Sequence, residues 1–193
     1  MNKLPNRVKK LTTFTLSLMI GLALVYSGYQ ASSIGQKQNS TSANSPRSKV
    51  IKVIDGDTAQ IEINGQIKTV RYIGMDTPEI VDPRKTVQCF GREASNKAHE
   101  LLDNQMIQLE YDRAVGEQDK YGRLLAYVVL PDGSLYNKKM IAEGYAKEYT
   151  YQDQSYKYQA DFKQAQKDAE SSQFGLWNQN TCSGDTTQPA KSI

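Results

Sequence analysis

Residues 50–73 read VIKVIDGDTAQIEINGQIKTVRYI, and this stretch decides the fold class of the chain. Its central dipeptide, Asn64-Gly65, is a strong signal for the two-residue turn of a β-hairpin. Apolar and polar side chains alternate before this turn, and the residues after it supply a return strand. Together with the β-branched run at its start, the stretch predicts a meander of three strands at 50–54, 58–63 and 66–73.

The rest of the domain mixes short strands with helices. The pattern of apolar residues predicts helices at 91–102, 135–143 and 153–171, and further strands at 106–111 and 123–130. Five short strands with interspersed helices predict an α+β, mainly β domain, built as a five-stranded OB-fold β-barrel with three helices. We expect this domain to occupy residues 49–180 and a C-terminal tail to occupy 181–193.

The N-terminus has the composition of a targeting segment. Four basic residues precede an apolar run at 11–29, which is typical of a secretory signal peptide within residues 1–31. The run is also nearly as long as the roughly 20 residues that span a bilayer, so an uncleaved membrane anchor stays open. Residues 32–48 are polar and rich in serine and asparagine, which predicts a disordered linker. We therefore expect a secreted protein, or a cell-surface protein with an N-terminal anchor.

The rare residue types limit the chemistry that this chain can perform. Its 193 residues include one histidine, His99, and two cysteines, Cys89 and Cys182, and its formal net charge is +3. A zinc site rich in histidine or cysteine is disfavoured, and so is a Ser-His-Asp or Cys-His mechanism unless His99 is its base. An enzyme of this composition would use carboxylates, arginines and a hard cation. Because cysteines usually pair outside a reducing compartment, we predict a Cys89–Cys182 disulfide rather than two buried thiols.

Two short segments combine charged residues with turn-forming residues. VIDGDT at 53–58 has the composition of a hairpin turn, but its two aspartates also place oxygen ligands close together, as hard divalent cations require. DKYGR at 119–123 has the composition of a solvated charged turn. Its arginine, Arg123, also offers a planar fork that can bind phosphate oxygens at two points.

A third segment, RYIGMDTPE at 71–79, has two interpretations. Asp76 and Glu79 have the spacing of a helix capping box, with Pro78 in the first turn. The alternative is that both carboxylates help to hold a cation beside a phosphate. Arg71 lies on the same strand face as Ile73 and would be partly buried, and a buried arginine needs an anionic partner, either a carboxylate or a bound phosphate.

In this order, VIDGDT, R-x-x-G-x-DTPE and DKYGR resemble the staphylococcal nuclease (thermonuclease) family. The resemblance extends over about residues 49–177 and includes GREA at 91–94 and GLW at 175–177. It implies an exported, calcium-dependent, sugar-non-specific endonuclease. Such an enzyme hydrolyses phosphodiester bonds of DNA and RNA by in-line attack of water and leaves 3′-phosphate ends.

The resemblance also implies a role for each motif residue. The implied calcium ligands are Asp57, Asp76 and the backbone carbonyl of Thr77, with Asp55 as a supporting carboxylate. The implied catalytic residues are Arg71 and Arg123, which hold the scissile phosphate, and Glu79, which acts on the attacking water. The implied substrate-binding residues are Lys120, Tyr121, Tyr149 and Tyr151, although the segment at 147–151 is one residue shorter than the family's usual spacing.

The expected partners are single- and double-stranded DNA and RNA, bound by a monomer without an obligate protein partner. Two other classes of protein stay open. A domain of this fold can lose catalysis and persist as a nucleic-acid or protein-binding module. A calcium-binding surface protein is the other alternative, but it leaves the paired arginines Arg71 and Arg123 unexplained. The complete set of motif residues favours the enzyme.

Overall fold

The computed structural model describes residues 46–80 and 87–189 of the chain. The predicted signal peptide or anchor at 1–31, and most of the predicted linker at 32–48, lie outside these residues. Within the described ranges, no helix is both long enough and apolar enough to cross a membrane.

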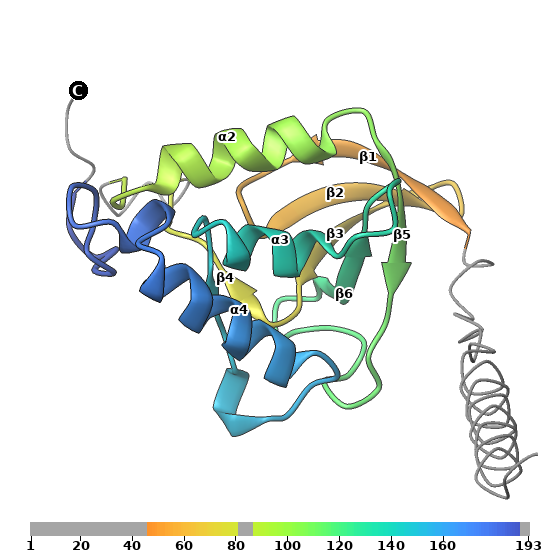
Figure 1. The fold of residues 1–193 in the computed structure, drawn as a ribbon. Coiled ribbons are helices and arrows are strands. Elements are labelled where there is room, and N and C mark those ends of the chain that lie inside the picture. The colour runs from red at the N-terminus through yellow and green to blue at the C-terminus, as the bar shows by residue number, and fades with distance from the viewer. Residues whose placement is uncertain (1–45, 81–86, 190–193) are drawn as a thin grey trace, which may run out of the picture. The chain divides into compact units, whose positions relative to one another are not determined.

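A closed barrel forms the centre of the domain, as the sequence predicts (Figure 1). Around the barrel the strand order is β1-β2-β3-β6-β5. The pairing of β3 with β6 is parallel, and the other pairs are antiparallel. The strands are β1 (Arg47–Val53), β2 (Thr58–Ile63), β3 (Gln66–Tyr72), β5 (Met106–Glu110) and β6 (Leu124–Val129). Strand β1 begins two residues before the expected start of the domain at Lys49.

The barrel interior explains the alternating pattern of the strands. Ile61 of β2 and Val70 of β3 are fully buried, and so are Ile107 of β5 and Val128 of β6. Because side chains alternate between the two faces of a strand, Gln60 and Glu62 of β2 lie on the face opposite to Ile61 and are more exposed than it is. The hairpin turn between these strands is Asn64-Gly65, and both residues have positive φ, 51° and 75°.

In the part of the chain that the structure describes, three α-helices accompany the barrel: α2 (Gly91–Leu102), α3 (Tyr136–Ala142) and α4 (Gln159–Ser171). Helix α3 packs against α4 and against β6. The prediction that α4 starts at residue 153 is wrong by six residues. A 3₁₀ turn, η1 (Tyr151–Asp153), precedes α4, and Gln152 and Asp153 have positive φ, 46° and 57°. Left-handed residues cannot continue a right-handed helix, so α4 begins only after this turn.

The predicted disulfide between Cys89 and Cys182 is present, with a Cα–Cα distance of 5.9 Å. Both cysteines are buried in a small apolar cluster with Leu176 of the 3₁₀ helix η2 (Gly175–Trp177). The backbone N–H of Cys89 also donates to the carbonyl of Gln188 at 2.8 Å. Residues 182–189, which the sequence assigns to a tail, are therefore attached to the body by a covalent bond and by a backbone hydrogen bond.

Gly144, which follows α3, lies directly against the backbone that leads into η2. A Cβ atom at Gly144 would overlap the carbonyl of Phe174, and its φ is +73°. We predict that Gly144→Ala lowers the free energy of unfolding by about 2–4 kcal/mol, because overlap adds to backbone strain. Gly133→Ala is the matched control, since Gly133 has φ of +84° but no atom within 4 Å of the added Cβ. It should lower the free energy by only about 1 kcal/mol in urea unfolding. Equal losses in the two variants would contradict the close approach at Gly144.

Candidate functional site

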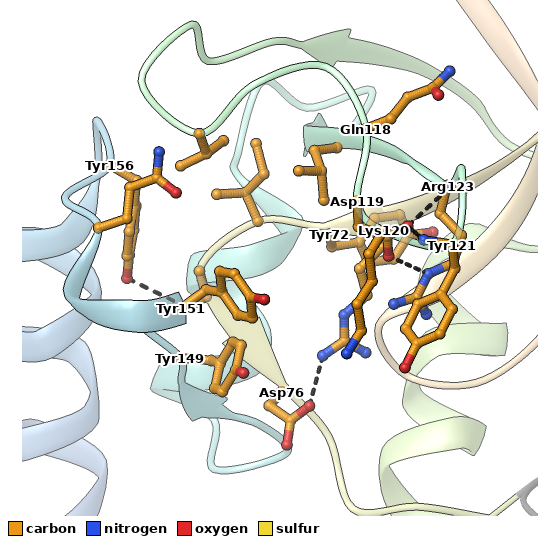
Figure 2. A pocket seen from close by; sticks show the side chains of 16 residues that line it. Tyr72, Asp76, Gln118, Asp119, Lys120, Tyr121, Arg123, Tyr149, Tyr151 and Tyr156 are labelled. Atoms are coloured by element: carbon orange, nitrogen blue, oxygen red, sulfur yellow. Dashed lines mark hydrogen bonds and ion pairs between the residues drawn. The ribbon is translucent and has the colours of Figure 1, made fainter.

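Two adjoining pockets bring the motif residues together. The smaller, of about 180 Å³, is lined by Asp55, Asp57, Arg71, Asp76, Thr77, Pro78, Glu79 and Gln88. The larger, of about 480 Å³, is lined among others by Lys120, Tyr121, Arg123, Tyr149 and Tyr151 (Figure 2). Arg71 and Asp76 line both pockets. Every catalytic, metal-binding and substrate-binding residue predicted from the sequence therefore lines one or both of these two pockets.

The turn between β1 and β2 supplies the first two carboxylates. Asp55 accepts a hydrogen bond from the backbone N–H of Asp57 at 3.1 Å, as expected of an aspartate in a turn. Asp57 is only 2% exposed, and its carboxylate accepts hydrogen bonds from the hydroxyl of Thr58 and from the backbone and hydroxyl of Thr77. The hairpin-turn interpretation of VIDGDT is thus confirmed, and the same turn carries two neighbouring carboxylates, whose binding of a cation stays a prediction.

The side chain of Arg71 on β3 lies between the carboxylate of Asp57 and a third carboxylate, that of Asp76. Its guanidinium forms an ion pair with Asp57 and a second one with Asp76 Oδ1 at 2.6 Å. Burial alone lowers the pKa of Arg71, but the two carboxylates raise it above its ordinary value. Of the two partners that the sequence left open, the structure shows carboxylates, and the side chain keeps 18% of its surface exposed toward the pockets.

Among the described residues, carboxyl groups outnumber the guanidinium of Arg71 in the smaller pocket. Of the residues that the structure describes, those that carry these groups are Arg71, Asp55, Asp57, Asp76 and Glu79. Burial, and after it the charge of Asp57, raises the pKa of Asp55 to about 7. Burial and the nearby carboxylates also raise the pKa of Asp76, although Arg71 opposes the shift. Carboxylate oxygens gathered in a small pocket are ligands of the kind that a hard divalent cation prefers.

The carboxylates line this pocket without converging on one point. Across residues 46–80 and 87–189, no group of three or more histidine, cysteine, aspartate or glutamate side chains is arranged so that it could hold a metal ion. The guanidinium of Arg71 lies between Asp57 and Asp76. Calcium binding by Asp57, Asp76 and Thr77 therefore stays a prediction, supported by the kind and charge of the oxygen donors.

The segment around Glu79 does not form the helix that a capping box requires, as far as Ile80. Asp76 instead belongs to β4 (Met75–Asp76), which pairs with β7 (Lys147–Glu148). Glu79 Oε1 accepts a hydrogen bond from the backbone N–H of Ile80 at 2.9 Å. Its carboxylate thus enters the smaller pocket from an irregular segment.

Gln88 is a member of the smaller pocket that the sequence did not reveal. Its side-chain oxygen accepts a hydrogen bond from the backbone N–H of Glu79 at 2.7 Å. No motif contains it, and a glutamine beside a cysteine has no recognisable pattern. Only the disulfide prediction at Cys89 could have drawn attention to this part of the chain.

One wall of the larger pocket is the DKYGR turn. Asp119 accepts hydrogen bonds from the backbone N–H groups of Tyr121 and Arg123 and from Arg123 Nε at 2.6 Å. Burial would raise the pKa of Asp119, but these hydrogen bonds lower it below its ordinary value. The Arg123 guanidinium lies 5.5 Å from the centre of the Tyr121 ring, and Lys120 Nζ lies 5.0 Å from it. Asp119 therefore fixes the direction of Arg123.

Tyr149 and Tyr151 form the opposite side of this pocket, beyond Asp76 (Figure 2). Their ring centroids are 6.5 Å apart, and the residues are 45% and 49% exposed. The pairing of β7 with β4 and a hydrogen bond from the Tyr149 N–H to the Gly74 carbonyl hold them there. The shortened spacing at 147–151 therefore still places both tyrosines in the pocket, where exposed rings can stack on bases.

Comparisons with known proteins agree with the geometry. A family model described as "Staphylococcal nuclease homologue" matches residues 69–179. The chain is 42% identical over 170 residues to the thermonuclease of Staphylococcus intermedius, covering 88% of this chain and 99% of that protein. It is 39% identical over 172 residues to the thermonuclease of Staphylococcus hyicus, covering 89% and 99%. It is 38% identical over 130 residues to the endonuclease YncB of Bacillus subtilis (strain 168), covering 67% and 60%.

The hydrogen bonds of Asp119 allow a test of the larger pocket's wall. We predict that Asp119→Ala lowers the free energy of unfolding by about 1–2 kcal/mol, because charge-assisted bonds are lost from a partly screened site. Asp132→Ala is the control, since Asp132 holds another turn by accepting two hydrogen bonds from Ser134 and lines neither pocket. Urea unfolding should show a clearly smaller loss for the control. The reverse order would mean that Asp119 does not fix the turn.

Proposed function

Because the chain belongs to the staphylococcal nuclease family and is a nuclease, we propose that it is an exported, calcium-dependent endonuclease that cleaves DNA and RNA and leaves 3′-phosphate ends. One observation carries the proposal. Arg71 and Asp76 line both pockets, so a pocket suited to a cation adjoins a pocket suited to a nucleotide. A phosphodiester bound at this junction would contact both.

The smaller pocket would hold the calcium ion. Asp57, Asp76 and the Thr77 carbonyl are the proposed ligands, with Asp55 nearby and Glu79 acting through a water molecule. Bound calcium would polarise the phosphate and help to neutralise its charge. The carboxylate oxygens of Asp55, Asp57 and Asp76 in this pocket are donors of the kind that calcium prefers, and this supports the assignment.

The arginines would bind the phosphate. Hydrolysis places growing negative charge on the equatorial oxygens of the phosphate, and rigid donors beside them lower the barrier. Arg123 is already oriented by Asp119 at 2.6 Å. Arg71 pairs with Asp57 and Asp76 at the junction of the pockets, and it would exchange part of these contacts for phosphate oxygens. Glu79 would orient the attacking water by accepting its hydrogen bond, since the chain's one histidine, His99, lies outside both pockets.

The tyrosines would bind nucleotides without reading sequence. Tyr121, Tyr149 and Tyr151 present exposed rings in the larger pocket, and stacking tolerates every base. Lys120 would contact a neighbouring phosphate, and phosphate contacts carry no sequence information. We therefore propose that DNA and RNA, single- and double-stranded, are all substrates of a monomeric enzyme.

The proposed 3′-phosphate ends can be tested directly. Analysis of product ends with a 3′-phosphatase distinguishes 3′-phosphate from 3′-hydroxyl ends.

The proposed export rests on the N-terminal composition, with its basic residues and the apolar run at 11–29. It leaves a choice between release and anchoring at the cell surface. Intact-mass analysis of the mature protein in the medium and in the membrane fraction decides this choice. A full-length chain in the cytoplasm would contradict export.

Arg123 provides the most direct test of the catalytic assignment. We predict that Arg123→Ala lowers kcat for single-stranded DNA by about 10²–10³-fold, as removal of one charge-stabilising donor does in other enzymes. Arg113→Ala is the control, because Arg113 is exposed and lines neither pocket. It should change kcat less than twofold. A small effect of Arg123→Ala in a protein with unchanged circular dichroism would mean that the phosphate site is misassigned.

Calcium binding can be measured apart from activity. We predict that calcium at a hundredfold excess over its dissociation constant raises the melting temperature by about 5–10 °C, because it binds only the folded state. Asp76→Ala should abolish most of this shift, whereas Asp132→Ala should retain it. If Asp76→Ala keeps the full shift, calcium binds elsewhere. If no variant responds to calcium and EGTA leaves cleavage unchanged, calcium dependence is wrong.

A further inference from the structure

Gln88 holds the backbone of Glu79 from two sides. Its side-chain oxygen accepts the Glu79 N–H at 2.7 Å, and its own backbone N–H donates to the Glu79 carbonyl at 3.0 Å. The backbone N–H and the backbone carbonyl of Glu79 are thus both hydrogen-bonded to Gln88. The side chain of Gln88 also lines the smaller pocket. A shift of Gln88 would therefore carry Glu79 with it.

Residues 182–189 fix Gln88 in turn. Gln88 forms an antiparallel bridge with Pro189, and the next residue, Cys89, donates its N–H to Gln188 at 2.8 Å. The disulfide ties Cys89 to Cys182, and both residues are almost fully buried, at 4% and 1% exposure. Backbone pairing and the disulfide thus link Gln88 and its neighbour Cys89 to residues 182–189.

The first residue of α2, Gly91, also contacts both Gln88 and the segment that carries Glu79. The N–H of Gly91 donates to the Gln88 carbonyl at 3.0 Å. A Cβ atom at Gly91 would come within 2.6 Å of the Ile80 side chain and 3.3 Å of the Glu79 carbonyl. Helix α2 therefore begins directly against the Glu79 segment and leaves it little room to move.

We propose that Gln88 is a positioning residue for Glu79, and that residues 182–189 act through the Cys89–Cys182 disulfide to keep Gln88 in place. This inference rests on the proposed role of Glu79 in turnover. Gln88 acts through the Glu79 backbone, so its loss should lower kcat and leave substrate binding in the larger pocket unchanged. A misplacement of about 1 Å in a catalytic group can lower turnover by up to 10²-fold.

Substitution of Gln88 tests the first step. Gln88→Met keeps the volume and removes the acceptor, and it should lower kcat about tenfold with KM unchanged within twofold. Gln88→Glu keeps an oxygen acceptor, so it should recover at least half of the kcat that Gln88→Met loses. Gln166→Met is the matched control, because Gln166 is also half-buried and its side-chain oxygen accepts the N–H of a glutamate, Glu148, at 2.7 Å. It should change kcat less than twofold.

The double variant Gln88→Met/Glu79→Gln separates positioning from a general loss of structure. If Gln88 acts through Glu79, then Gln88→Met should lower kcat no further in the Glu79→Gln background. Cys89→Ala/Cys182→Ala, assayed well below its melting temperature, should lower kcat several-fold and likewise lose this effect when Glu79 is replaced. Full additivity of the effects, or a kcat unchanged by Gln88→Met, would overturn the inference.

Failure of the proposed function would look different. If Glu79→Gln alone leaves kcat unchanged, Glu79 has no role in turnover and the proposed mechanism is wrong. If Glu79→Gln lowers kcat strongly while Gln88→Met and the cysteine variant do not, the mechanism stands and only the positioning role is refuted.

Discussion

The ion pairs of Arg71 with Asp57 and Asp76 join the parts on which the rest of the site depends. Arg71 comes from β3, Asp57 from the turn before β2, and Asp76 from β4. The pairing of Thr58 with Arg71 in the β2–β3 ladder sets their approach. A slip of one residue in this register would turn Arg71 to the opposite face of the strand. The position of Arg71 in the site therefore depends on the register of the barrel strands.

The charges in the smaller pocket are hard to explain by a contribution to stability alone. Among the described residues, one guanidinium and four carboxyl groups line a small pocket, and burial raises the pKa of Asp55 to about 7. Repulsion among buried carboxylates destabilises the folded state unless a cation is present. A cluster of this kind is typical of functional sites, where a ligand supplies the missing charge. The position of Arg71 between the two pockets means that cation and phosphate would meet at the same guanidinium.

The sequence predicted what depends on local patterns and missed what depends on contacts between distant segments. Alternation and Asn64-Gly65 identified the barrel strands, and the motif order identified the pocket residues. The start of α4 was missed because Gln152 and Asp153 adopt positive φ without being glycine. The pair β4–β7 was missed because two-residue strands carry no periodicity. Gln88 was missed because its function lies in backbone hydrogen bonds to Glu79, which composition does not encode.

The Cys89–Cys182 disulfide acts on two different states of the chain. Its sequence separation of 93 residues restricts the unfolded chain, which in the chain-entropy model stabilises the fold by at most about 4–5 kcal/mol. That effect changes the population of folded molecules and not the rate of each one. The hydrogen bonds from Cys89 to Gln188 and from Glu79 to Gln88 exist only in the folded state. Any effect of the disulfide on kcat, measured where all molecules are folded, must therefore pass through contacts of the folded state, and these two hydrogen bonds are the ones that lead to Glu79.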